Sequence, residues 1–64
     1  MLSPTIRERR MEAHMTQGQF AKALNIKQTQ LSRYERGAAY PSLEVLFKME
    51  EALNCKLKDL YLEK

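Results

Sequence analysis

The segment from Thr16 to Asn25, TQGQFAKALN, constrains the fold of this chain more than any other stretch. Thr16 is a favourable helix N-cap, and Gln19 stands three residues later, as a capping box requires. The apolar spacing inside the segment is helical, and the helix is expected to end near Leu24. Asn25 tolerates the left-handed conformation of a tight turn. The segment therefore predicts a short, capped helix followed at once by a sharp turn.

A second short helix is expected directly after that turn, over residues 28–36, with Gly37 at its C-terminus. At about 100° per residue, Leu31 and Tyr34 fall on one side of this helix. Its opposite side carries polar and basic residues without a carboxylate, whereas a solvated helix face usually mixes both signs of charge. These outer residues are Gln28, Thr29, Ser32, Arg33 and Arg36.

Three further helices are expected around this pair. Ser3 and Pro4 are typical of a helix start, which predicts a first helix to about Ala13. Ser42 caps a helix that runs to about Leu53, and a last short helix follows Leu57. No segment alternates apolar and polar residues over the length of a strand. The prediction is an all-α, compact, five-helix fold that forms a single domain over residues 1–64.

The expected core is small, because a chain of 64 residues buries only about 60% of the surface that its unfolded form exposes. Loss of Leu31 or Leu46 is therefore expected to be nearly fatal to the fold. The predicted inward-facing residues are Ile6, Met11, Phe20, Ala21, Leu24, Ile26, Leu31, Tyr34, Leu43, Leu46, Met49 and Leu53.

Composition excludes several classes of protein. The single cysteine, Cys55, allows no internal disulfide and indicates a reducing, cytoplasmic setting. No apolar run approaches the roughly 20 residues that span a bilayer, and the N-terminus has no signal-peptide core. The only histidine, His14, has no neighbouring nucleophile or metal ligand. No catalytic, metal or cofactor motif is present, so an enzyme, a metal site and a cofactor are not expected.

The net charge of +3 is unevenly distributed. Residues 1–40 hold seven Lys and Arg against three Glu, and residues 41–64 hold four Lys against five acidic residues. The basic excess coincides with the outer side chains of the 28–36 helix. Glutamine matches the donor and acceptor of adenine, arginine matches the two acceptors of guanine, and threonine offers a methyl group to thymine. The alternative is a polar helix face that contacts only water.

The packing pattern separates these alternatives. The pattern TQ-x-x-F-A-x-x-L-N-I-x-x-x-x-L-S-R-Y-E-R-G, followed by Pro41-Ser42-Leu43, resembles the Cro/cI-type (XRE-type) helix-turn-helix family. The resemblance runs from about Ile6 to Leu60. It implies a compact lambda-repressor-like domain, with helices 2 and 3 as the helix-turn-helix. It also implies binding to double-stranded operator DNA, usually as a two-fold homodimer.

The resemblance also assigns roles to individual residues. Gln28, Thr29 and Arg33 occupy the positions that read bases. Arg10 and Glu35 resemble the internal ion pair of the family. Gln17 resembles the family glutamine that holds a phosphate and braces the recognition helix. Flanking or phosphate contacts are implied for Lys27, Gln30, Ser32 and Arg36.

Four positions depart from the family pattern. Gly18 lies inside a helix, where it should cost up to about 1 kcal/mol. Lys27 stands where a small capping residue is usual, and His14 stands where glycine is frequent, so His14 is expected in a left-handed conformation. Cys55 replaces a small aliphatic residue and is interpreted as a small hydrophobe.

The C-terminal residues offer more apolar surface than one short helix can bury. A dimer contact is therefore expected at Asn54, Leu57, Leu60 and Tyr61, the alternative being that they pack on the fourth helix. The function predicted from all of this is a cytoplasmic, nucleoid-associated transcriptional regulator, in particular a repressor. The alternative is the antitoxin of a toxin–antitoxin pair, with a toxin as protein partner.

Overall fold

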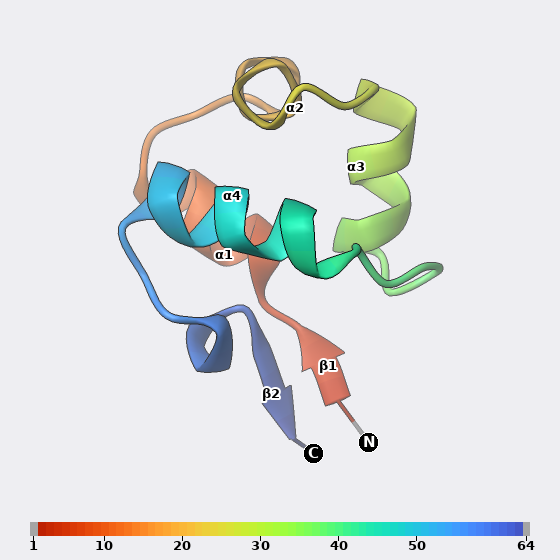
Figure 1. The fold of residues 1–64 in the computed structure, drawn as a ribbon, viewed down its shortest axis with the longest axis vertical. Coiled ribbons are helices and arrows are strands. Elements are labelled where there is room, and N and C mark those ends of the chain that lie inside the picture. Colours follow the sequence, from red (N-terminus) through yellow and green to blue (C-terminus); the bar gives the residue numbers. More distant parts are fainter. Residues whose placement is uncertain (1, 64) are drawn as a thin grey trace.

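The computed structural model describes residues 2–63 and contains four α-helices (Figure 1). A single 3-10 turn, η1, and a two-stranded antiparallel ribbon complete the described part of the chain. In chain order the elements are β1 (Leu2–Pro4), α1 (Ile6–Glu12), α2 (Gln17–Leu24), α3 (Gln28–Glu35), α4 (Leu43–Leu53), η1 (Leu57–Asp59) and β2 (Tyr61–Glu63).

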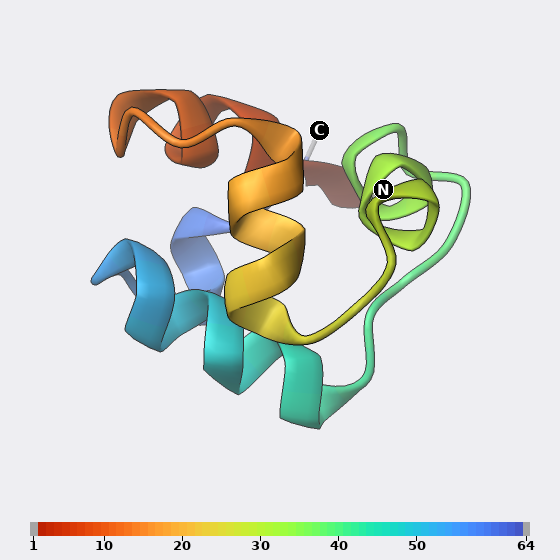
Figure 2. The same ribbon diagram turned by 90° about the horizontal axis from the view of Figure 1, so that it is seen from above.

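The predicted helix-turn-helix is present as α2 and α3. The Thr16 hydroxyl accepts a hydrogen bond from the Gln19 backbone N–H at 3.1 Å. The Gln19 side-chain oxygen accepts in return from the Thr16 N–H at 2.8 Å, so the capping box is confirmed. Asn25 ends α2 in the left-handed conformation, with φ of 58°. In Figure 2 α2 is seen lengthwise and α3 nearly end on, which shows how steeply the two helices cross.

Local signals also set the neighbouring boundaries. Gly37 has a φ of 76°, which favours glycine and ends the α3 segment. The Ser42 hydroxyl accepts from the Val45 N–H at 3.3 Å and caps α4. His14 adopts the expected left-handed conformation, with φ of 59°. The signals at Gly37 and Ser42 need only neighbouring residues, which explains why the sequence predicts them, whereas the conformation of His14 was expected from the family pattern.

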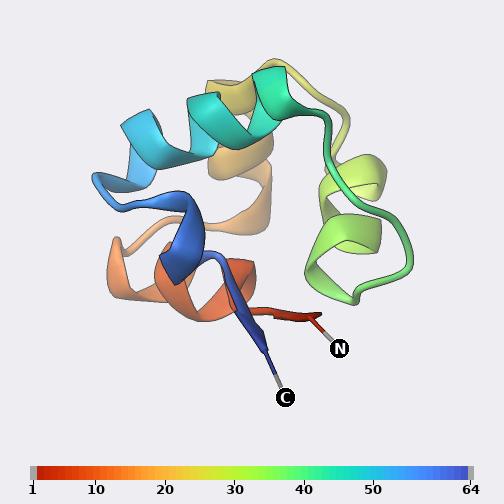
Figure 3. The same cartoon turned by 60° about the horizontal axis from the view of Figure 1, so that its bottom comes forward.

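The two ends of the chain differ from the prediction. Pro4 does not start a helix. It lies in β1, which pairs with β2 in the register Leu2 with Glu63, Ser3 with Leu62 and Pro4 with Tyr61 (Figure 3). The predicted fifth helix is replaced by η1 and β2. The prediction of five helices without a strand was therefore wrong at both termini, because the two strands stabilise each other across the whole chain.

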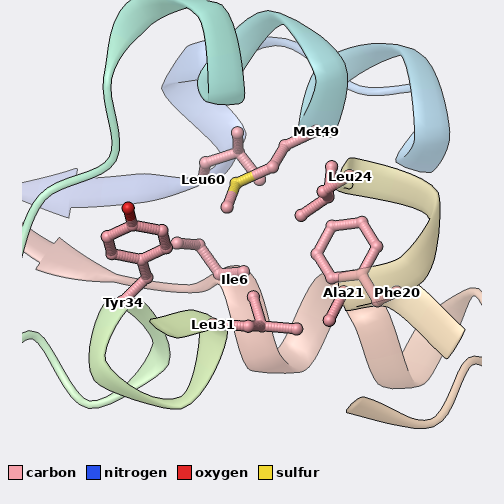
Figure 4. Close-up of a cluster of buried hydrophobic side chains, with 8 residues drawn as sticks. All are labelled: Ile6, Phe20, Ala21, Leu24, Leu31, Tyr34, Met49 and Leu60. Atoms are coloured by element: carbon pink, nitrogen blue, oxygen red, sulfur yellow. The ribbon is translucent and has the colours of Figure 1, made fainter. Parts of the chain in front are cut away.

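The core gathers side chains from every helix and from the segment after η1 (Figure 4). Seven of its eight buried residues belong to the predicted inward set, and the eighth is Leu60. Ile26, Leu46 and Leu53 are half-buried and pack at its margin. The eight buried residues of this hydrophobic cluster are Ile6, Phe20, Ala21, Leu24, Leu31, Tyr34, Met49 and Leu60.

Two residues predicted to face inward are exposed instead. Met11 is 56% exposed and Leu43 is 64% exposed. Met11 lies about 140° around α1 from the buried Ile6, so one helix cannot direct both toward the same core. Leu43 begins α4 about 120° away from the buried Met49. The prediction counted apolar residues without requiring that they share one face of the helix.

Candidate nucleic-acid interface

The outer side of α3 presents a continuous polar strip, which we define as Gln28, Thr29, Ser32, Arg33 and Arg36. All of these side chains are exposed except Ser32, which is half-buried. On the opposite side of the helix, Leu31 is fully buried and Tyr34 is 6% exposed. The apolar side of α3 therefore fixes the helix to the core and directs the outer strip toward solvent.

An ion pair joins α1 to the end of α3. The Arg10 guanidinium donates through Nε to Glu35 Oε2 at 2.7 Å and through Nη2 to Glu35 Oε1 at 3.3 Å. The side chains are only 12% and 4% exposed, respectively. Arg10 also donates to the Met15 carbonyl oxygen at 2.9 Å. The ion pair expected between these two residues is thus present, in a two-pronged geometry that fixes their mutual orientation.

Gln17 extends this ion pair to the start of α3. Its amide nitrogen donates to Glu35 Oε1 at 3.1 Å, and its amide oxygen accepts from Gln28 Nε2 at 3.3 Å. We call the resulting chain of contacts, Arg10 to Glu35 to Gln17 to Gln28, the bracing network. The sequence predicted the bracing role of Gln17 but not its bond to Gln28. The only available signal was that both glutamines open a helix.

Gly18 makes room for that contact. A Cβ atom added at this position would lie 3.3 Å from Gln28 Oε1. The sequence indicated only the cost of glycine inside a helix. The structure adds that a larger residue would press on the side chain at the start of the outer strip.

The residues predicted to flank the base contacts differ in how free their side chains are. Lys27 occupies the N-cap of α3, but its exposed side chain makes no capping bond. Gln30, also predicted as a flanking residue, donates through Nε2 to the Tyr34 hydroxyl at 2.9 Å. Arg36 donates through Nε to the Ser32 carbonyl oxygen at 3.4 Å, within its own helix. Their contacts with DNA stay predictions.

The predicted dimer residues lie in unlike environments. Leu60 has no exposed surface and belongs to the core, so it is not available to a second subunit. Asn54 is exposed at the C-cap of α4, with φ of 52°. Tyr61 is half-buried. Its burial raises the pKa of its hydroxyl, and the nearby Tyr40 and Tyr34 raise that pKa to a smaller extent. The side chain of Leu57 lies outside the described part of the structure.

Exposed apolar side chains gather instead just before α4 and along its first half. Tyr40 is 65% exposed, Leu43 is 64% exposed and Phe47 is 54% exposed. The Tyr40 ring lies 5.6 Å from that of Tyr61, centroid to centroid. We call Tyr40, Leu43 and Phe47 the apolar patch. The sequence did not predict it, because Leu43 was assigned to the core and Phe47 to neither surface nor core.

Metal and membrane signals are lacking in the described segment. Residues 2–63 contain no cluster of three metal-ligating side chains. None of the helices in this range has the length and apolar character needed to cross a membrane.

The geometry defines the class of protein. A short capped helix, a tight turn and a second helix with an exposed polar strip form a helix-turn-helix, which presents side chains to the major groove of DNA. The sequence matches the family described as Helix-turn-helix over residues 6–60. The chain belongs to this XRE-type family, whose members are DNA-binding transcription regulators without enzymatic activity.

Sequence and structural similarity to known proteins supports this family membership. Multiprotein-bridging factor 1a of Arabidopsis thaliana is 37% identical over 57 residues, which cover 89% of this chain and 40% of that protein. The chain thus spans about 40% of the length of this relative. A candidate DNA-binding protein from Bacteroides fragilis has a similar structure, with a TM-score of 0.87 and 26% identity. The match covers 97% of this chain and 100% of that one.

The P22 c2 repressor, solved in complex with a synthetic operator, is also similar. Its TM-score is 0.78 at 28% identity, over 83% of this chain and 80% of the repressor chain. The fold of this chain is therefore shared with a protein whose solved structure includes its DNA.

Proposed function

We propose that this chain binds double-stranded DNA in a sequence-specific manner and acts as a transcriptional repressor. In this proposal α3 enters the major groove of an operator. The observation that carries the proposal is the outer strip, held outward by a buried apolar side and oriented by the bracing network. A repressor needs no further chemistry, because a domain that fills the operator excludes other proteins from it.

The chemistry of the strip supports base recognition. Gln28 can donate and accept at once, which matches N6 and N7 of adenine. Arg33 can donate two hydrogen bonds to O6 and N7 of guanine, and the Thr29 methyl group can contact thymine. Gln28 and Thr29 lie in the first turn of α3, the part of a recognition helix that contacts base edges.

Other residues support contacts with the DNA backbone. Lys27 is exposed at the start of α3, and Gln17 opens α2, where free backbone N–H groups favour an anion. Such contacts position the protein without reading sequence, and they supply much of the affinity. This division of roles makes the proposal testable residue by residue.

We further propose that the operator is bound by two copies of the chain, which meet at the apolar patch. Leu43 and Phe47 are one helical turn apart on the same side of α4, so two antiparallel α4 helices related by a two-fold axis can place Leu43 of each copy against Phe47 of the partner subunit. A patch of this kind covers a few hundred Å². A stable interface needs about 800 Å² from each partner. The second copy is therefore expected to bind mainly on DNA, with the two α3 helices about 34 Å apart.

Paired titrations test base recognition. Arg33→Ala should lose about 1–3 kcal/mol of binding free energy on a matched site and relax the base preference there. Lys27→Ala should weaken a matched and a scrambled duplex by the same factor, because a phosphate contact does not depend on sequence. Fluorescence anisotropy with both duplexes measures the two effects. Equal losses on both duplexes for Arg33→Ala would contradict base recognition.

A further inference from the structure

A polar groove lies between α1, the first turn of α2 and α3. Figure 2 shows α1 and α3 on either side of the start of α2. The groove has a volume of about 550 Å³. The Arg10–Glu35 ion pair and Gln17 contribute to its lining. The walls are formed by Arg7 and Glu8 from α1 and by Ser32 and Arg36 from α3.

The charges of the groove leave two cations available. Arg10 and Glu35 neutralise each other through their 2.7 Å contact. Arg7 and Arg36 are exposed, and none of the carboxylates among the described side chains forms an ion pair with either. Glu8 on the α1 wall is the remaining lining carboxylate. Two arginines from different helices therefore face an open polar space against one opposing charge.

The groove borders the outer strip of α3. Ser32 and Arg36 belong both to the strip and to the wall of the groove, and Gln28 lies one turn before Ser32 on the same side of the helix. A helix seated in the major groove is flanked by the two phosphate backbones of the duplex. The backbone on the α1 side would then pass over this groove, with Gln17 at the start of α2 beside it.

We infer that the groove receives one phosphate of the DNA backbone, held by Arg7 from α1 and Arg36 from α3. The inference rests on the proposed function and extends the DNA interface to α1, outside the helix-turn-helix itself. A guanidinium donates two parallel hydrogen bonds to phosphate oxygens, and the Ser32 hydroxyl supplies a further donor. Clamping one phosphate between two helices fixes the angle at which α3 enters the major groove.

Glu8 provides an internal control of opposite sign. Its carboxylate lines the same groove and repels a phosphate there. Glu8→Gln removes that repulsion while it keeps the length of the side chain. If a phosphate occupies the groove, Arg7→Ala weakens DNA binding and Glu8→Gln strengthens it.

The experiment measures the dissociation constant as a function of KCl concentration, with a matched and a scrambled duplex. Arg7→Ala should weaken binding to both duplexes by the same several-fold factor. It should also reduce the slope of log K against log[KCl] by about 0.9, the loss expected for one phosphate contact. Glu8→Gln should tighten binding to both duplexes. Lys58→Ala removes one charge from η1, which lies on the far side of the domain from α3 (Figure 1), and should change neither quantity appreciably.

The outcomes distinguish the groove from the proposed function. If Arg7→Ala matches Lys58→Ala in affinity and in slope, the groove holds no phosphate. If Arg7→Ala weakens only the matched duplex, Arg7 contacts a base and the inference is wrong. If the wild-type chain binds neither duplex, the proposed function fails and the groove assignment fails with it. Arg7 is exposed, so the variant should melt as the wild type does, and Arg7→Gln repeats the test should Arg7→Ala melt early.

Discussion

The helix-turn-helix and the two chain ends are stabilised in different ways. Thr16 and Gln19 cap α2 with bonds that span three residues. At the ends, the Thr5 N–H donates to the Leu60 carbonyl oxygen at 2.7 Å, and the Thr5 hydroxyl donates to the Asp59 carbonyl oxygen. Those bonds join residues more than fifty positions apart. One region is thus organised by its own sequence, and the other forms only when the rest of the domain has folded.

The largest expected effect tests whether the two regions share one core. Leu31 of α3 and Leu60 of the C-terminal segment are both fully buried. Leu31→Ala and Leu60→Ala should each cost about 2–5 kcal/mol of unfolding free energy, because each leaves a cavity in the same cluster. Urea denaturation followed by circular dichroism measures both. Loss of stability in Leu31→Ala alone would mean that the C-terminal segment packs independently of the core.

The next effect concerns the bracing network. Glu35→Ala should cost about 3 kcal/mol or more, because it leaves Arg10 mostly buried without its counterion. The double variant Arg10→Met with Glu35→Leu should recover much of that loss, since removing both charges also removes their desolvation cost. Thermal melts of the single and double variants decide the question. A loss below half a kcal/mol for Glu35→Ala would show that the pair contributes little to stability.

These two regions also explain what could be predicted from the sequence. The caps at Thr16 and Ser42 and the turn at Asn25 depend on neighbouring residues, and each is present in the structure. Pro4 was ambiguous, because proline suits both the first turn of a helix and an edge strand. The choice depends on Tyr61, its partner in the ribbon, and nothing near Pro4 reveals that pairing.

The candidate site also combines features that neighbouring residues determine with features that depend on distant parts of the chain. The outer strip of α3 follows from helical periodicity, and its exposure agrees with that expectation. The bond between Gln17 and Gln28, the space beside Gly18 and the groove beneath Arg7 depend on how helices pack, which a single sequence does not show. Their geometry follows from tertiary structure alone.

A smaller effect isolates the contacts between the chain ends. The Thr5 side chain makes no capping bond to α1, so its hydroxyl serves the bond to the Asp59 carbonyl oxygen. Thr5→Val should cost about 1 kcal/mol of unfolding free energy. Thr5→Ser keeps the hydroxyl and should cost less. Chemical denaturation compares the two variants, and an equal loss in both would show that the hydroxyl bond is not what Thr5 contributes.

The smallest effect has the opposite sign and lies in the helix-turn-helix. Gly18→Ala should stabilise the fold by up to about 1 kcal/mol, because alanine is the better helix former. Its Cβ would also press on Gln28 Oε1, so the bond between Gln28 and Gln17 should weaken and base preference should broaden. Melts and competition with single-base variants of the site measure both effects. In a Gln28→Ala background the change in preference should vanish, and its persistence would exclude Gln28 as the cause.

The central claim is that the exposed strip of α3 selects DNA by sequence. It is tested most directly by sequencing the duplexes that the purified chain retains from a random pool at low ionic strength. The account predicts an enriched two-fold symmetric motif, with half-sites centred about 10 base pairs apart. It also predicts that Arg33→Ala loses the preference at one position of each half-site and keeps it elsewhere. A retained pool that is indistinguishable from the starting pool would contradict the account.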